Sequence, residues 1–138
     1  MNLRSILLPA VALIASAAFA AAPKITDVNE ALSKGEADKK MVFIQYGREA
    51  CGNCQALKAM IKGGKVHLSP SKFVYADVNC DDAATSKAFG SKFKVSGNTL
   101  PFVVIAGPDG KQLAARTGGG RAQDFEKLIK DAEKALKK

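Results

Sequence analysis

The sequence predicts an α/β fold built on a single mixed sheet of about four strands, with helices on both faces. Short segments of β-branched and apolar residues alternate with segments of helical apolar spacing, which favours parallel strand pairing. The last two apolar segments are joined by Gly107-Pro108-Asp109-Gly110, a turn signature that indicates an antiparallel hairpin. No repeat or low-complexity linker interrupts residues 21–138, so they are expected to form one domain.

Four segments have the spacing of amphipathic helices, and most carry start or stop signals. Asp27 and Glu30 have the form of a capping box before the first helix, and Gly35 is expected to end it. Asp82 offers an N-cap for a third helix that runs to about Phe93. The other two predicted helices are the one that carries the cysteine pair and runs to about residue 62, and a closing helix over 121–136.

The predicted strands are short and rich in Val, Ile, Phe and Tyr, as buried strands usually are. They cover residues 41–46, 73–78, 101–106 and 111–117. The element order is therefore helix, strand, helix, strand, helix, strand, strand, helix. In open α/β sheets of this kind, functional sites lie at the carboxyl ends of strands, near helix N-termini.

The first 20 residues have the pattern of a signal peptide. Arg4 supplies a positive charge, an Ala-rich apolar core covers 6–19, and Ala18-Phe19-Ala20 fits the small-x-small rule for cleavage after Ala20. An uncleaved membrane anchor is less favoured, because such anchors need about 20 strongly apolar residues. We therefore expect an exported protein without a stable membrane anchor, located in the periplasm or, as the alternative, outside the cell.

The chain is basic, with a formal net charge of +8 and a sequence pI of about 9.5. The lysines are dispersed over predicted helix faces, and no basic stripe is interleaved with aromatic residues. This distribution argues against nucleic acid as a partner.

The main candidate for chemistry is Cys51-Gly52-Asn53-Cys54, where a predicted buried strand gives way to a helix. Residues three apart on a helix are neighbours, so the two sulfurs can approach bonding distance. The partial positive charge of a helix N-terminus favours a thiolate. Cys51 is therefore the expected attacking sulfur and Cys54 the expected resolving sulfur. Gly52 allows a tight turn and leaves room for a partner's backbone.

Two other interpretations of the cysteine pair remain open: a structural disulfide, and part of a metal site. A zinc site needs about four ligands, and only Cys80 and His67 remain to complete one. Gln55 follows Cys54, so the haem-attachment pattern is absent. A sensor that also uses Cys80 is a further alternative. We expect no metal and no cofactor.

Residues 24–136 resemble the thioredoxin superfamily. The resemblance is carried by the Cys51–Cys54 motif after a buried strand, by Leu100-Pro101 at the start of a later strand, and by the hairpin and closing helix. It implies a thiol-disulfide oxidoreductase that exchanges disulfides with protein substrates and is reset by a redox partner protein. It also implies that Pro101 is cis and lies beside the cysteines, and that Thr99 and Leu100 bind an extended substrate segment.

The chain departs from the family pattern around the cysteines. Ala50 replaces the usual Trp, and Gln45 occupies the place of a buried acid that assists proton transfer from the resolving cysteine. Glu49 or water then takes that proton, or resolution is slow. Arg48 is expected to lower the pKa of Cys51, whereas Glu49 opposes it.

The direction of exchange stays open at this stage. The dipeptide Gly52-Asn53 differs from the commonest family pairs and influences the reduction potential, so an oxidant, an isomerase and a reductant are all compatible with the sequence. The rival to an enzyme is a binding module that keeps the fold and a structural Cys51–Cys54 disulfide without turnover.

Overall fold

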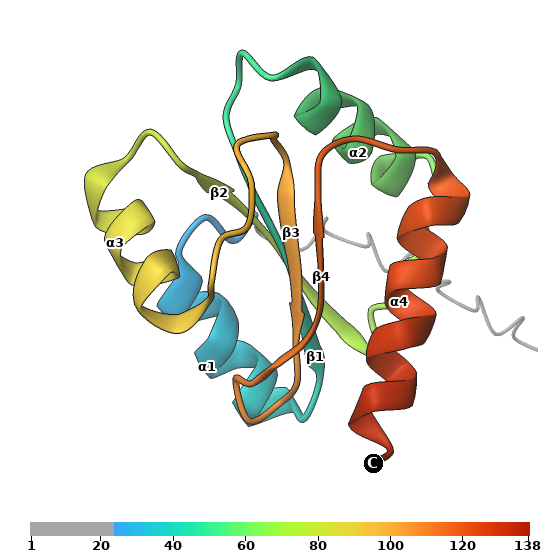
Figure 1. The fold of residues 1–138 in the computed structure, drawn as a ribbon. Helices are drawn as coiled ribbons and strands as arrows, with labels where there is room; N and C mark the ends of the chain where they lie inside the picture. The colour runs from blue at the N-terminus through green and yellow to red at the C-terminus, as the bar shows by residue number, and fades with distance from the viewer. Residues whose placement is uncertain (1–23) are drawn as a thin grey trace, which may run out of the picture.

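The computed structural model describes residues 24–138, so the signal-peptide prediction for residues 1–20 lies outside the described residues. Four helices and four strands follow one another in the predicted order (Figure 1). They are α1 (Val28–Asp38), β1 (Met41–Gly47), α2 (Gly52–Lys62), β2 (Phe73–Asn79), α3 (Ala83–Lys92), β3 (Phe102–Ala106), β4 (Gln112–Thr117) and α4 (Ala122–Leu136).

The strands form one mixed sheet in the order β2-β1-β3-β4. β1 runs parallel to β2 and antiparallel to β3, and β3 forms the predicted hairpin with β4. All seven residues of β1 are buried, because this strand is central and is covered on both faces. A single bridge from Ile25 to Ala76 extends the sheet beyond β2.

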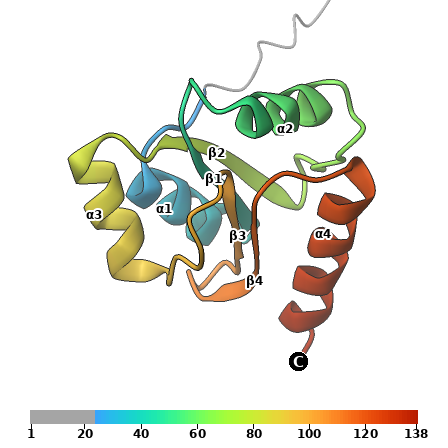
Figure 2. The same ribbon diagram turned by 45° about the horizontal axis from the view of Figure 1, so that its top comes forward.

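Helices cover both faces of the sheet, as the sequence predicts. Figures 1 and 2 show α1 and α3 on one side and α2 and α4 on the other. Alternate residues of β1 divide between the two resulting cores, since successive strand side chains point to opposite faces. Val42 and Ile44 pack with Phe89 of α3, whereas Met41 and Phe43 pack with Leu57 of α2.

The predicted N-caps at Asp27 and Asp82 are present, although the capping box of Asp27 with Glu30 is only half formed. Asp27 caps α1 by accepting a hydrogen bond from the Glu30 N–H (2.8 Å), and Asp82 caps α3 in the same way with Thr85 (2.8 Å). The prediction that Gly35 ends α1 is wrong, because the helix continues to Asp38 and Lys39 closes it with a left-handed φ of 56°. Gly35 is buried inside the helix, where a side chain would collide with Val42 of β1.

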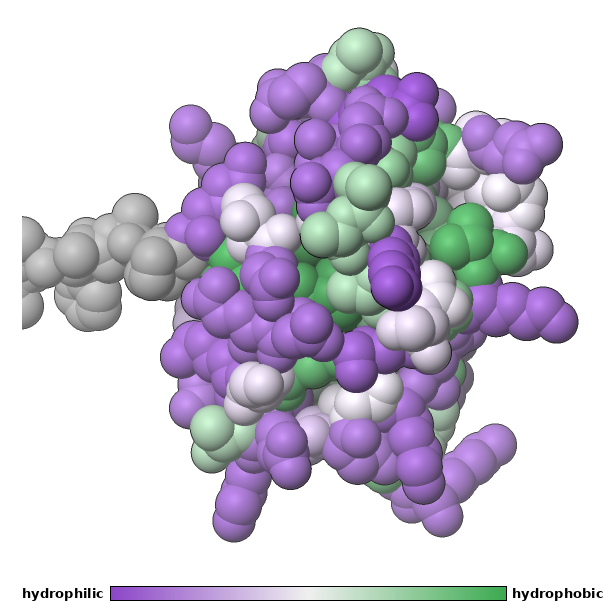
Figure 3. Space-filling view, turned by 90° about the vertical axis from the view of Figure 1, so that its left-hand side faces the viewer, coloured by the Kyte–Doolittle hydropathy of each residue, from purple (hydrophilic) through white to green (hydrophobic). Residues whose placement is uncertain are grey.

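The surface is largely hydrophilic. Figure 3 shows this for the face that carries α1 and α3. Val95 and Leu136 are the exposed large hydrophobic residues among residues 24–138. None of the helices in this described part is both long and apolar enough to cross a membrane.

Candidate active site

The cysteine pair lies at the start of α2, where the sequence predicts it. Cys51 is the N-cap residue with an extended backbone, and its Sγ accepts a hydrogen bond from the Cys54 N–H at 3.1 Å. The two residues form a disulfide with their Cα atoms 5.2 Å apart. Cys51 is half-buried and Cys54 is fully buried. Cys51 is therefore the more accessible cysteine of the pair, and the roles of attacking and resolving sulfur stay predictions.

Gly47, the last residue of β1, brings Pro101 to the cysteines. A methyl group on Gly47 would lie 2.5 Å from Cys54 Sγ and 3.9 Å from Cβ of Pro101. The sulfur therefore packs directly on the Gly47 backbone, and Pro101 lies against the same residue. The Leu100–Pro101 peptide is cis, as the resemblance implies.

The residues before Pro101 are available at the surface. Thr99 is exposed and Leu100 is half-buried, whereas Pro101 itself is buried. The Gly118 N–H donates to the Pro101 carbonyl at 2.9 Å and holds this segment against the end of β4. The three residues predicted to bind substrate thus form one segment beside the cysteine pair.

The two residues between the cysteines have different surroundings. Gly52 is exposed, and no atom lies within 4 Å of the position that a side chain would occupy there. The exposed Asn53 side chain approaches the turn between β4 and α4, so closely that a methyl on Gly119 would lie 2.6 Å from its Cγ. The open side of the motif is thus at Gly52, which leaves the room for a partner's backbone that the sequence predicts.

Arg48 and Glu49 precede the motif, and their side chains bind groups other than Cys51. Arg48 Nη2 donates to Cys80 Sγ at 3.4 Å and pairs with Asp81 at 3.0 Å. The hydrogen bond to Cys80 and the charges of Cys80 and Asp81 raise the pKa of Arg48. Cys80 is a half-buried free thiol at the end of β2, and its N–H donates to the Gly47 carbonyl at 2.8 Å.

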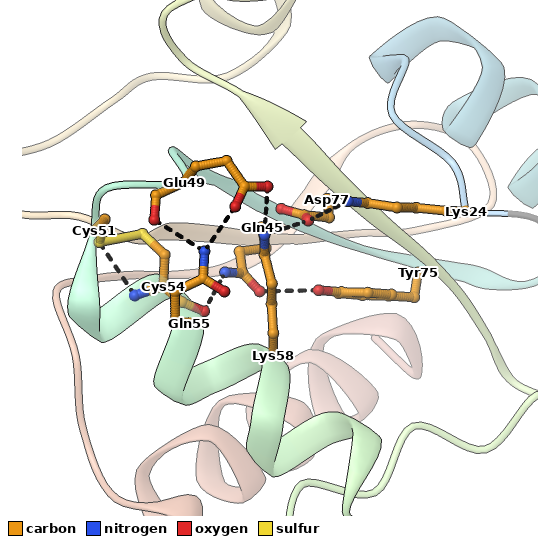
Figure 4. Close-up of polar contacts among 9 residues, drawn as sticks. All are labelled: Lys24, Gln45, Glu49, Cys51, Cys54, Gln55, Lys58, Tyr75 and Asp77. Carbon is orange, nitrogen blue, oxygen red and sulfur yellow. Dashed lines mark hydrogen bonds and ion pairs between the residues drawn. A yellow bond between two sulfur atoms is a disulfide. The ribbon is translucent and has the colours of Figure 1, made fainter.

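Glu49 is the more exposed of these two residues, with 87% of its side chain accessible. Its carbonyl and carboxylate oxygens accept hydrogen bonds from Gln55 Nε2 at 3.0 and 3.3 Å (Figure 4). The carboxylate is therefore held on the outer side of α2, and Cys54 is buried beneath that helix.

Gln45 lies beneath the cysteines and is fully buried. Its Nε2 donates to the Cys54 carbonyl at 2.9 Å, and its Oε1 accepts from the Tyr75 hydroxyl at 3.0 Å. Burial raises the pKa of Tyr75, and the negative charge of Asp77 raises it further, so the hydroxyl keeps its proton and remains a donor. Both ends of the Gln45 amide are therefore occupied by groups other than the cysteine sulfur.

Solved structures of thioredoxins share this architecture. A mutant thioredoxin from Halobacterium salinarum is 21% identical, with a TM-score of 0.60 over 80% of this chain and 89% of its own. A thioredoxin f2 in complex with ferredoxin:thioredoxin reductase is 16% identical, with a TM-score of 0.62 over 80% and 94%. The germline-specific thioredoxin Deadhead of Drosophila melanogaster is 17% identical, with a TM-score of 0.59 over 78% and 96%.

The chain has a thioredoxin-like fold. No protein-family model matches the sequence, and no curated protein matches it. At identities of 16–21% the likeness describes the fold, and the chemistry has to be argued from the residues of this chain.

Within the thioredoxin-like fold, sequence reasoning missed an ionic group beside Gln45. Asp77 of β2 pairs in register with Gln45 of β1. Its carboxylate is only 10% exposed and binds Lys58 of α2 at 2.8 Å and Lys24 at 3.2 Å (Figure 4). The signal available in the sequence was a carboxylate inside the apolar segment 73–78, since an Asp is rarely buried unless it is paired.

A surface pocket of about 400 Å³ opens next to this group. Gly47, Lys58 and Asp77 contribute to its wall, together with Arg48 and Glu49. The pocket therefore reaches from the glycine that contacts Cys54 Sγ to the carboxylate of Asp77.

The sequence leaves a metal site open as an alternative, and the described part of the chain contains no cluster of ligands for one. Among residues 24–138 no three His, Cys, Asp or Glu side chains are grouped as metal ligands would be. His67 is exposed, and its N–H donates to the Glu126 carboxylate at 2.6 Å.

Proposed function

We propose that this protein is a thiol-disulfide oxidoreductase that exchanges disulfides with protein substrates through Cys51 and Cys54. The observation that carries the proposal is the placement of the pair: a half-buried cysteine at the N-cap of α2 and a fully buried cysteine one turn later. Helix N-termini stabilise thiolates, and a thiolate is the form that attacks disulfides.

In the proposed reaction, the Cys51 thiolate attacks a substrate disulfide and forms a mixed disulfide, while the other substrate sulfur leaves as a thiolate. The Cys54 thiolate then attacks Cys51 Sγ and releases the second substrate sulfur. The substrate is reduced and the Cys51–Cys54 disulfide is formed. The reverse sequence donates a disulfide to a reduced substrate.

Thr99, Leu100 and Pro101 are the proposed docking segment for an extended part of the substrate. Two observations support this role: Pro101 lies against Gly47, the residue that contacts Cys54 Sγ, and Thr99 is exposed. A redox partner protein is proposed to reset the dithiol. The Ala-rich leader over 6–19 supports export, with the periplasm as the favoured compartment.

The alternative function is a binding module in which Cys51–Cys54 only stabilises the fold. Gln45 favours this alternative, because its amide replaces an acid and does not bond to the sulfur. The reduction potential separates the two functions, since structural disulfides typically lie below about −300 mV and catalytic ones lie higher.

The experiment is turnover with a disulfide-containing protein. We expect the wild-type protein to reduce insulin in the presence of dithiothreitol, Cys51→Ser to abolish this activity, and Cys80→Ser to retain it. Cys54→Ser should accumulate mixed disulfides through Cys51. Equal insulin reduction by wild type and Cys51→Ser, with no trapped partner on Cys54→Ser, would exclude the enzyme and leave the binding module.

A further inference from the structure

The reaction proposed above requires the fully buried thiol of Cys54 to lose a proton before it attacks Cys51. Free cysteine thiols have a pKa of about 8.5, and burial in apolar surroundings raises it further. A group that receives the proton therefore has to be close to Cys54 or connected to it through water. Of the two groups expected from the sequence to fill this role, Glu49 is held on the outer side of α2 by Gln55.

Gln45 is a fully buried polar side chain bound to the backbone of Cys54, and it cannot take the proton. Its Nε2 is a donor already bound to the Cys54 carbonyl, and its Oε1 accepts the Tyr75 hydroxyl. An uncharged amide is moreover a very weak base compared with a carboxylate. The site therefore has a buried thiol and no base in direct contact with it among the described polar contacts.

The residue paired with Gln45 across the sheet supplies the missing carboxylate. In a parallel ladder, residues in register project their side chains to the same face. Asp77 pairs with Gln45, and its carboxylate reaches Lys58 on α2, the helix that also carries Cys54. Asp77 is thus on the same face of the sheet as the buried sulfur.

The pocket of about 400 Å³ borders the region between these groups. Gly47, Lys58 and Asp77 are all among the residues that line it. Cys54 Sγ packs on Gly47, which has no side chain to separate the sulfur from the pocket wall. A water molecule in a polar cavity needs two to four polar partners and about 30 Å³, so the pocket has room for a short chain of water.

We propose that Asp77 receives the proton of Cys54 through water in this pocket and thereby takes over the role of the acid that Gln45 replaces. The inference rests on the proposed function. In the resolving step the Cys54 thiol gives its proton to the Asp77 carboxylate, and the resulting thiolate attacks Cys51 Sγ. The bond between Cys51 and the substrate sulfur breaks, and that sulfur leaves with the electron pair. Asp77 acts through water, so it is a positioning residue and does not contact the reacting atoms.

Two charged groups and one neutral titratable group face Asp77. Lys24, which precedes α1, and Lys58 on α2 pair with its carboxylate, and the hydroxyl of Tyr75 on β2 is neutral. Lys58 Nζ also lies 3.9 Å from the exposed Glu49 carboxylate. A row of charged groups therefore runs from Asp77 through Lys58 to Glu49 at the surface. Arg48, Asp27 and Asp82 also line this pocket.

The test separates attack by Cys51 from resolution by Cys54. All proteins carry Cys80→Ser, so that the only thiols are those of the pair; each reduced protein is mixed with 5,5′-dithiobis(2-nitrobenzoate), and release of the coloured thiolate is followed by stopped flow. The first equivalent reports formation of the mixed disulfide on Cys51, and the second reports its resolution by Cys54. Failure of the first phase would overturn the proposed function, whereas the role of Asp77 affects the second phase alone.

We expect Asp77→Asn to slow the second phase at least tenfold at pH 6–7 and to leave the first phase unchanged, because positioned bases contribute typically 10²–10⁴-fold to rates. The defect should shrink as the pH is raised, because hydroxide can then remove the thiol proton without a carboxylate base. The second phase of wild type should also be slower in D₂O, and Asp77→Asn should lose most of this isotope effect.

Two further variants control for loss of the ion pair. Lys58→Met breaks the same contact from the other side and keeps the carboxylate, so its second phase should stay within about threefold of wild type. Asp131→Asn removes a carboxylate that pairs with Lys127 at 2.7 Å on α4 and should change neither phase. An unchanged or faster second phase in Asp77→Asn, or a slowing that is equal at every pH, would overturn the proposal.

Discussion

Gly47 is the residue whose substitution tests the geometry of the site most directly. A methyl group at this position would lie 2.5 Å from Cys54 Sγ, whereas optimal contacts between heavy atoms lie at roughly 3.5–4.0 Å. Gly47→Ala therefore requires a shift of about 1 Å by a sulfur that is fully buried and fixed by its disulfide. Overpacking of this kind costs about 1–3 kcal/mol, and the gain from replacing glycine offsets about 0.5–1 kcal/mol.

The expected result is a net loss on the order of 1 kcal/mol in the free energy of unfolding of the oxidised protein. The matched control is Gly90→Ala on α3, where nothing lies within 4 Å of the added methyl. This control should gain about 0.5–1 kcal/mol, because alanine is favoured over glycine within a helix. Urea unfolding is followed by circular dichroism, since the chain contains no Trp. If Gly47→Ala proves as stable as wild type, the sulfur does not pack on Gly47 as described.

Two other predictions concern polar groups near the site. Gln45→Leu should cost about 2–3 kcal/mol in urea unfolding, because the Tyr75 hydroxyl and the Cys54 carbonyl lose their buried partner; an effect below about 0.5 kcal/mol would mean that water replaces the amide. Hydrogen bonding from Thr85 lowers the pKa of Asp82 from 3.8, so this cap stabilises the protein above about pH 4 and its contribution is lost as the pH falls through the folded pKa. The melting temperature of Asp82→Asn should therefore approach that of wild type below pH 4, and a constant difference over pH 2–6 would contradict this reasoning.

The fold was largely predictable because its signals are local. The caps at Asp27 and Asp82, the turn at 107–110 and the strand periods are each encoded within a few residues, and each specifies an element that the structure contains. The exception is Gly35. A glycine near a helix end usually marks a stop, but here it marks close contact with Val42 of the next strand. That contact depends on tertiary packing, which the local pattern does not contain.

The parts of the site that are close in sequence were also predictable. The pairing of Cys51 with Cys54 follows from helical spacing, and the resemblance implies the cis Pro101 beside them. The partners of Arg48 were not predictable, since Cys80 and Asp81 approach it only because β1 and β2 end side by side. The same limit applies to Asp77, whose relation to Gln45 depends on the register between two strands that are 32 residues apart.

Under our proposal, the register between β1 and β2 explains how the site keeps acid–base chemistry although residue 45 is a neutral glutamine. In an isolated strand no neighbour along the chain projects its side chain to the same place as residue 45. No other carboxylate could therefore substitute for an acid at that position. In a parallel pair the residue in register projects its side chain to the same face of the sheet. A carboxylate on β2 is then displaced from the corresponding position on β1 by only one strand spacing, about 4.8 Å. The buried amide of Gln45 then serves to fix the α2 backbone at Cys54, and the charge is carried by Asp77, where two lysines and an open pocket stabilise it. In our proposal this separation of roles also depends on Gly47, which contacts Cys54 Sγ and lines the pocket that Asp77 borders, so the three positions have to be considered together.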